Sequence, residues 1–185
     1  MGKVVILGGN ARSGKTTIAY RLLKHGYKII SFDDLNKYIE EGLNINFDSL
    51  SQEQQFNLFE TVVKQALLET KNENLNICID MYDYLPSDIS KLKNINKLEI
   101  YFLAYPSCSK EQIKYNVVHY AKKTDWIAQV NESYLEECVD RFFERNILLQ
   151  VECKKYNMAL VDTKSGDERE KVLNELIKNI LNREV

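Results

Sequence analysis

The fold of this chain is decided near its start by the octapeptide Gly9-Asn10-Ala11-Arg12-Ser13-Gly14-Lys15-Thr16. An apolar run, Val4-Val5-Ile6-Leu7, precedes it, and an amphipathic segment from Thr17 to His25 follows. The octapeptide fits the pattern Gly-x4-Gly-Lys-[Ser/Thr], in which backbone N–H groups surround a chain of phosphates. The alternative is a glycine-rich turn without a ligand. Because strand, loop and helix stand in the order that the pattern requires, we expect a phosphate-binding loop.

Each part of the octapeptide has a physical reason. Glycine at both ends lets the backbone turn tightly and approach the phosphates closely. The helix that follows leaves its first N–H groups unpaired, and the partial positive charge there attracts anions. Lys15 is expected on the β- and γ-phosphates, and the Thr16 hydroxyl is placed to bind Mg²⁺. The predicted phosphate-binding residues are Gly9, Asn10, Ala11, Arg12, Ser13, Gly14, Lys15, Thr16 and Thr17.

The composition indicates one ordinary globular domain. The 185 residues are 44% apolar and 28% charged, which is enough for a core of its own. The net charge of −2 gives no electrostatic footprint for nucleic acid or an anionic membrane. We find neither a leader peptide nor a run of roughly 18 apolar residues, and we therefore expect a cytoplasmic protein. The four cysteines form no Cys-x-x-Cys pair and are expected to be reduced thiols.

Hydrophobic periodicity predicts strands that alternate with helices. The capping-box spacing of Ser51 with Gln54 and of Ser133 with Glu136 predicts two of the helix starts. This alternation is typical of a parallel sheet covered on both faces, which makes the expected fold a three-layer α/β/α sandwich. The predicted strands are 3–8, 27–31, 75–80, 97–104 and 158–161, and the predicted helices are 14–25, one from Leu35, 51–70, a helical stretch at 109–130, 131–154 and 167–182.

Acidic residues follow two of the predicted strands. Asp33 and Asp34 come directly after the second strand, and Asp80 ends the third. The carboxyl ends of parallel strands meet at one edge of the sheet, next to the phosphate loop. We expect one of the pair, preferably Asp33, to take a proton from a substrate hydroxyl or hold Mg²⁺ through water, and the other to cap the next helix. Asp80 is expected to order Mg²⁺ through water, although any parallel strand can end in aspartate.

Two further groups keep two interpretations each. The segment from Met81 to Pro86 contains two tyrosines and either lines a substrate pocket or forms a half-exposed turn. Arg141 and Arg145 are four residues apart and share a helix face. Either they reach phosphate across a cleft, or they form ion pairs with acidic neighbours on the surface, which is the commoner arrangement of charged residues on a helix. Both arginines are kept as candidate catalytic residues.

Together, Gly9 to Thr16, Asp33/Asp34, Asp80 and Val161-Asp162-Thr163 resemble the small phosphate-loop kinases, a group that includes adenylate, shikimate, gluconate and uridine kinases and the zeta-toxin and antibiotic phosphotransferases. Asp125-Trp126 and the stretch from Tyr156 to Thr163 look like uncharacterised bacterial ATP-binding members. The resemblance implies a strand order of 2-3-1-4-5 and a substrate region between strands two and three. It also implies a lid at about 109–130 within a single domain whose core is 1–108 and 131–185, and a turn from Thr163 to Gly166 beside the adenine.

The chain departs from these kinases in its arginines. Kinases of nucleoside monophosphates use arginines between strands two and three, because a planar bidentate fork suits the acceptor phosphate. This chain has no arginine between Arg21 and Arg141. Its lid region lacks the usual arginine cluster as well, with Lys122 and Lys123 as substitutes together with Arg141 and Arg145. An unphosphorylated acceptor with a hydroxyl is therefore expected, in preference to a nucleotide.

Two classes of function follow. In the first, a phosphotransferase binds MgATP along residues 9–17, Asp33 activates the acceptor hydroxyl, and Lys15, Mg²⁺ and a lid cation offset the charge of the moving phosphoryl group. In the second, a nucleotide-binding switch or slow ATPase regulates a partner. The absence of an Asn-Lys-x-Asp segment disfavours GTP. The expected partner is a small-molecule substrate, and the sequence predicts neither the acceptor nor the oligomeric state.

Overall fold

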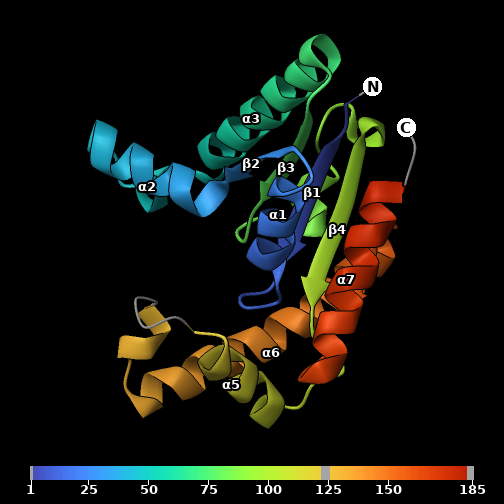
Figure 1. Cartoon of the computed structure of the whole chain (residues 1–185). Coiled ribbons are helices and arrows are strands. Elements are labelled where there is room, and N and C mark those ends of the chain that lie inside the picture. The colour runs from blue at the N-terminus through green and yellow to red at the C-terminus, as the bar shows by residue number, and fades with distance from the viewer. Residues whose placement is uncertain (1, 122–125, 183–185) are drawn as a thin grey trace.

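The computed structural model describes residues 2–121 and 126–182. Their centre is a five-stranded sheet in the order β2-β3-β1-β4-β5, and each neighbouring pair of strands is parallel. The predicted α/β sandwich and the strand order 2-3-1-4-5 are thus confirmed (Figure 1). The strands are β1 (Val4–Gly9), β2 (Tyr27–Ser31), β3 (Asn76–Asp80), β4 (Leu98–Ala104) and β5 (Ala159–Asp162).

Helices connect the strands and cover both faces of the sheet (Figure 1). They are α1 (Lys15–Leu23), α2 (Phe32–Leu43), α3 (Gln52–Glu73), α4 (Pro86–Ile89), α5 (Lys110–His119), α6 (Glu132–Lys155) and α7 (Asp167–Asn182), with 3₁₀ turns η1 (Phe47–Ser49), η2 (Ile95–Lys97) and η3 (Trp126–Gln129). The helical stretch expected at 109–130 is interrupted after α5, and the short α4 has no counterpart in the sequence prediction. Over the described residues, no helix combines the length and apolar content needed to cross a membrane.

Alternating residues of the buried strand β1 enter two separate cores. Val5 and Leu7 pack with α1 and α7 on one face of the sheet. Val4 and Ile6 pack on the other face with α3 and the C-terminal half of α6. A strand buried on both faces reads as an unbroken apolar run, as the first residues of this chain do.

A third apolar cluster lies beyond the carboxyl ends of the strands. It joins α5 to the N-terminal half of α6 through Ile113, Val117, Cys138 and Phe142. Helix α6 therefore belongs to two cores, and its first half extends past the sheet, alongside α5 (Figure 1). The predicted lid, 109–130, falls partly in this region. Because residues 122–125 lie outside the described part of the chain, the lid remains a prediction.

Helix starts correct two of the sequence predictions. Asn131, and not Ser133, caps α6, because its side chain accepts a hydrogen bond from Tyr134 N–H. Ser133 and Glu136 already lie inside the helix. Neither aspartate of the Asp33-Asp34 pair caps α2, since the Ser31 hydroxyl accepts the bond from Asp34 N–H and both aspartates lie in the first turn. The capping box of Ser51 and Gln54 is confirmed at α3.

Candidate functional site

The backbone of the phosphate loop turns at residues with positive φ. Gly9 has φ 125°, Arg12 φ 57° and Gly14 φ 101°. A Cβ atom at Gly9 would lie 2.0 Å from the main-chain oxygen of Leu103, so only glycine fits beside β4. Left-handed residues interspersed among right-handed ones turn successive N–H groups to one side, which creates an anion-binding concavity. The first N–H groups of α1 add to it, since a helix start leaves them without helical partners.

Three consecutive carbonyl groups of the loop are held from behind. The Asn10 carbonyl accepts from Ser13 Oγ at 2.8 Å. The Ala11 carbonyl accepts from the Tyr105 hydroxyl at 2.6 Å, and the Arg12 carbonyl from Arg169 at 2.7 Å. Oxygen atoms that are bonded on the protein side do not point at an incoming anion. The protein itself therefore fixes the orientation of these three carbonyl groups.

Lys15 is only 8% exposed although it carries a charge. Its ammonium group donates to the Asn10 carbonyl at 2.7 Å and lies 5.6 Å from the centre of the Tyr82 ring. Burial lowers the pKa of Lys15, while the nearby carboxylates of Asp80 and Asp33 work in the opposite direction. A polyphosphate would supply the full compensating charge that the loop carbonyl does not.

Thr16 and Asp80 meet at the edge of the sheet. The Thr16 hydroxyl donates to Asp80 Oδ2 at 2.8 Å. Burial raises the pKa of Asp80, partly opposed by Lys15 and by the Thr16 hydrogen bond. Hydroxyl and carboxylate oxygens suit Mg²⁺, which takes its remaining ligands from water and phosphate. The described residues contain no cluster of three or more His, Cys, Asp or Glu side chains that could hold a metal ion.

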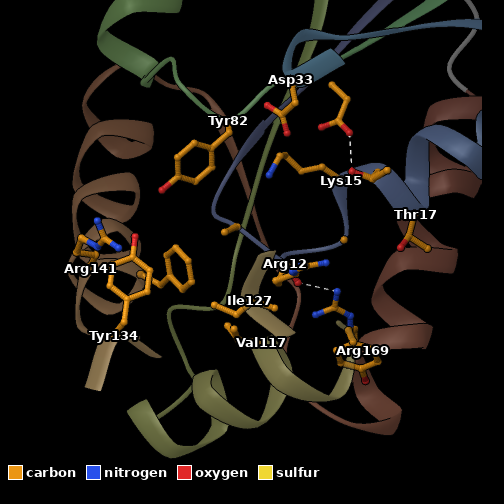
Figure 2. A pocket seen from close by; sticks show the side chains of 16 residues that line it. Arg12, Lys15, Thr17, Asp33, Tyr82, Val117, Ile127, Tyr134, Arg141 and Arg169 are labelled. Atoms are coloured by element: carbon orange, nitrogen blue, oxygen red, sulfur yellow. Dashed lines mark hydrogen bonds between the residues drawn. The ribbon is translucent and has the colours of Figure 1, made fainter. Parts of the chain in front are cut away.

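A cavity of about 600 Å³ opens between the phosphate loop and α6 (Figure 2). Lys15, Asp33 and Tyr82 lie at one end, and Val117 and Ile127 lie at the other. The volume is in the range of small-molecule sites. Its lining consists of Ala11, Arg12, Gly14, Lys15, Thr16, Thr17, Asp33, Asp80, Tyr82, Val117, Tyr120, Ile127, Tyr134, Arg141, Phe142 and Arg169.

Solved structures similar to this chain include kinases of small molecules. A shikimate kinase from Bacteroides thetaiotaomicron has a TM-score of 0.56 at 19% identity, over 97% of this chain and 98% of its own. A shikimate kinase from Acinetobacter baumannii in complex with shikimate has a TM-score of 0.55 at 16% sequence identity, over 99% of this chain and 96% of its own. A gluconokinase from Sinorhizobium meliloti 1021 has a TM-score of 0.55 at 16% sequence identity, over 97% of this chain and 95% of its own.

This chain has the fold of the small-molecule kinases. No protein-family model matches its sequence, and no curated protein matches it significantly. At 16 to 19% identity the likeness concerns the fold, and roles of individual residues have to be argued from the cavity itself.

The small-molecule kinase fold separates the two aspartates that follow β2. Asp33 lines the large cavity together with Lys15 and Asp80. Asp34 lines a second cavity of about 390 Å³, between α1 and α2, whose wall includes Tyr20 and Tyr38. Thr16 and Asp80 line both cavities, so what distinguishes Asp33 from Asp34 is that it shares a cavity with Lys15.

The two candidate arginines of α6 separate as well. Arg141 lines the large cavity, with its guanidinium 5.5 Å from the centre of the Tyr134 ring and one nitrogen 3.1 Å from Cys138 Sγ. Arg145 is not among the lining residues. Its guanidinium lies 4.3 Å from the centre of the Tyr82 ring and donates to the Tyr82 carbonyl. Neither arginine forms an ion pair with the acidic residues of α6 among the described salt bridges.

Arg169, in the first turn of α7, is a residue of the cavity that the sequence prediction missed. It is 4% exposed, and its guanidinium lies 4.3 Å from the centre of the Tyr120 ring. Burial lowers its pKa, and one terminal nitrogen has no hydrogen-bond partner. A buried guanidinium at the wall of a cavity suits an anionic or carbonyl-bearing ligand. No sequence motif surrounds it that would have drawn attention to it.

Several predicted contacts lie behind the cavity and not in it. Gly9, Asn10 and Ser13 belong to the loop but are absent from the cavity lining. The turn from Thr163 to Gly166, expected beside the adenine, is likewise absent, and its Lys164 carbonyl lies 3.4 Å from the Asn116 amide. In the loop after β3, Tyr82 lines the cavity, whereas Met81 and Tyr84 are buried in the core and not half exposed as the alternative interpretation expected. Lys122 and Lys123 lie outside the described residues.

Proposed function

We propose that this protein transfers the γ-phosphoryl group of MgATP to a hydroxyl of a small, unphosphorylated metabolite. The observation that carries the proposal is the juxtaposition of Lys15, Asp33 and the Thr16–Asp80 pair in one cavity of about 600 Å³. The neighbouring folds, which include a shikimate kinase with shikimate bound and a gluconokinase, support a small acceptor.

In the proposed mechanism the chain supplies position and charge. Main-chain N–H groups of the loop residues that line the cavity, Arg12 and Gly14 to Thr17, would hold the triphosphate, since the N–H groups of Asn10 and Ala11 already have partners within the protein. Lys15 would exchange the Asn10 carbonyl for the β- and γ-phosphates of the nucleotide. Mg²⁺, held by Thr16 and Asp80, would neutralise charge on the phosphates. Asp33 accepts the proton of the acceptor hydroxyl, and Arg141 offsets charge on the moving group from across the cavity.

The acceptor is proposed to be unphosphorylated because few cations lie at the end of the cavity that contains Asp33, whereas Arg12, Arg141 and Arg169 line other parts of it. Lys15 is committed to the nucleotide, and Arg145 is held on the Tyr82 ring and carbonyl. The sequence contains no arginine between Arg21 and Arg141. Asp33 lies at the same end of the cavity as Lys15 and Tyr82, where we place the acceptor. A phosphate monoester would there face a carboxylate without a bidentate partner.

The test combines binding with an acceptor screen. Wild-type protein is mixed with MgATP and panels of nucleosides, sugars, cyclic hydroxy acids and aminoglycosides, and ADP release is followed. We expect one class to accelerate release, and Lys15→Ala to abolish the acceleration while its circular dichroism spectrum stays unchanged. Wild-type turnover in Lys15→Ala would contradict the mechanism.

A nucleotide-dependent switch is the second candidate. The position of Arg145 favours the switch. This arginine stacks on Tyr82 and does not line the cavity, so it does not offset charge on a phosphoryl group there. A switch would bind MgATP, as isothermal titration calorimetry would show, but release ADP at a rate that no acceptor changes. The same screen therefore separates the two candidates.

A further inference from the structure

A buried network of amide groups joins the phosphate loop to α6. Asn10 Nδ2 donates to the Phe142 carbonyl at 2.7 Å and to Asn146 Oδ1 at 2.9 Å. Asn146 Oδ1 also accepts from Tyr105 N–H at 3.2 Å. Asn10 is 0% and Asn146 2% exposed. The second residue of the loop is therefore bonded directly to the middle of a helix far away in the sequence.

Hydrogen bonds specify a position more narrowly than apolar packing does. Apolar clusters, which tolerate small shifts along the helix axis, make much of the contact between α6 and its surroundings. Two further hydrogen bonds of α6, from Arg145 to the Tyr82 carbonyl and from Ser87 N–H to Glu152, involve side chains that are not bonded to the phosphate loop. An amide buried as deeply as Asn146 loses free energy if its partners move out of reach. The network thus fixes the register of α6 against the loop to within the range of a hydrogen bond.

The fixed part of α6 is the part that faces the cavity. Phe142, whose carbonyl receives the bond from Asn10, lines the cavity itself. Arg141 precedes it, lines the same cavity, and lies across from Lys15 and Arg12 in Figure 2. Asn146 follows one helical turn later and is not among the lining residues. Any influence of Asn146 on a ligand must therefore act through the network.

We propose that Asn146 is a positioning residue, which through Asn10 and Phe142 holds Arg141 where it meets the phosphoryl group in the transition state. The inference rests on the proposed function, because it assigns Asn146 a part in the same site. A displacement of the order of 1 Å in a transition-state contact can cost a large share of its effect. Binding of the ground-state nucleotide, which the loop itself performs, depends less on the position of α6.

A double-mutant cycle with a transition-state analogue tests this without knowledge of the acceptor. Calorimetry measures the affinity for MgADP alone and for MgADP with aluminium fluoride, which mimics the moving phosphoryl group. In Asn146→Ala we expect MgADP affinity within about threefold of wild type and the fluoride complex weakened roughly tenfold. Arg141→Ala should weaken the fluoride complex in the wild-type background and change it much less in Asn146→Ala.

Three further variants keep the test sharp. Asn131→Ala removes the cap of the same helix without touching the network, so it should lower stability and leave the fluoride complex unchanged. Asn146→Asp keeps the oxygen acceptor for Asn10 and for Tyr105 N–H but loses the Nδ2 donor to the Tyr105 carbonyl, so its fluoride complex should be weaker than that of wild type and tighter than that of Asn146→Ala. Asn146→Leu fills the same space without polar atoms and replaces Asn146→Ala if that variant does not fold.

The outcomes are distinguishable. If the wild type does not bind MgADP, the proposed function fails and this inference fails with it. If the wild type binds, but Asn146→Ala forms the fluoride complex as tightly as wild type, only the inference is overturned. Full additivity of Arg141→Ala and Asn146→Ala would overturn it too, since the two residues would then act independently.

Discussion

Tyr105 shows what one side chain contributes to an anion-binding loop. It is fully buried, and its hydroxyl donates to the Ala11 carbonyl at 2.6 Å. Tyr105→Phe removes only that donor and leaves a buried carbonyl unpaired. We expect the free energy of unfolding to fall by about 1–3 kcal/mol and the affinity for MgATP to weaken, because the carbonyl is then free to turn toward the phosphates. Urea denaturation and calorimetry measure the two effects.

The control for this change is Tyr38→Phe. Tyr38 is 70% exposed on α2, on the side of the smaller cavity, so loss of its hydroxyl should alter neither quantity. A Tyr105→Phe variant with reduced stability but unchanged MgATP affinity would show that the hydroxyl stabilises the fold without shaping the loop.

Cys153 gives the protein a defined sensitivity to alkali. Burial raises the pKa of its thiol to about 12, with Glu152 as a smaller cause. A raised pKa in the folded state means that the contribution to stability is complete below the unfolded pKa near 8.5 and is lost as pH rises toward 12. We expect the loss that Cys153 causes in this window to approach about 1.4 kcal/mol per pH unit.

The measurement compares wild type with Cys153→Ala by urea denaturation at pH 8 and pH 10.5. The missing sulfur contacts cost the variant the same at both pH values, and other alkaline groups such as Tyr27 titrate in both proteins. The stability of the variant should therefore fall less between the two pH values. An equal fall in both proteins would contradict a raised pKa at this position.

Among single residues, the sequence predicted the positions of those that belong to a motif or lie at the end of a strand. Lys15, Thr16 and Asp80 lie together because the loop and two neighbouring strands end at one edge of the sheet. Arg169 and Tyr105 were missed because their bonds to the loop connect residues far apart in the sequence. A periodic helix pattern contains no information about which of its polar residues turns inward to a distant carbonyl.

Among the elements, helix α3 is the one whose start the sequence predicted in full. The Ser51 hydroxyl accepts from Gln54 N–H at 3.2 Å, and the Gln54 side chain accepts from Ser51 N–H at 2.9 Å. Ser51→Ala should lower the free energy of unfolding by about 1 kcal/mol, which corresponds to roughly 2–4 °C in the melting temperature of a domain of this size. Thermal unfolding followed by circular dichroism measures the change.

Thr61→Ala, on the exposed side of the same helix, is the matched control. The Thr61 hydroxyl bonds only to the Asn57 carbonyl one turn earlier, and alanine has the higher helix propensity. The melting temperature of this variant should stay equal or rise. A fall as large as that of Ser51→Ala would mean that the capping box has no special part in the stability of α3.

The start of α6 is a helix boundary that the sequence alone did not predict correctly. Ser133 and Glu136 have the spacing of a capping box, yet Asn131 caps the helix two residues earlier. Both Ser and Asn are good N-caps, so their residue types do not decide between them. The packing of Leu135 and Cys138 against α5 fixes where the first turn lies, and this contact is tertiary.

For the whole molecule, the strand order followed from the resemblance to known kinases and from alternation of strands and helices, and the sheet confirms it. The cavity could not be predicted in the same way. Its wall is assembled from the phosphate loop, the start of α2, the ends of β3 and α5, the turn η3, the first half of α6 and the start of α7. Which side chains of these segments face one another depends on how the helices pack, and no local pattern records that.

A cavity assembled from both ends of the chain predicts that ligand binding and global folding are linked. Because unfolding separates the loop from Arg141 and Arg169, MgATP should bind only the folded state. At a concentration of 100 times its dissociation constant, it should stabilise the protein by about 2.7 kcal/mol, or roughly 5–10 °C in melting temperature. Differential scanning calorimetry over a series of MgATP concentrations measures the shift, and Lys15→Ala should show none. A wild-type melting temperature that no purine nucleoside triphosphate changes would contradict the phosphate loop as a binding site.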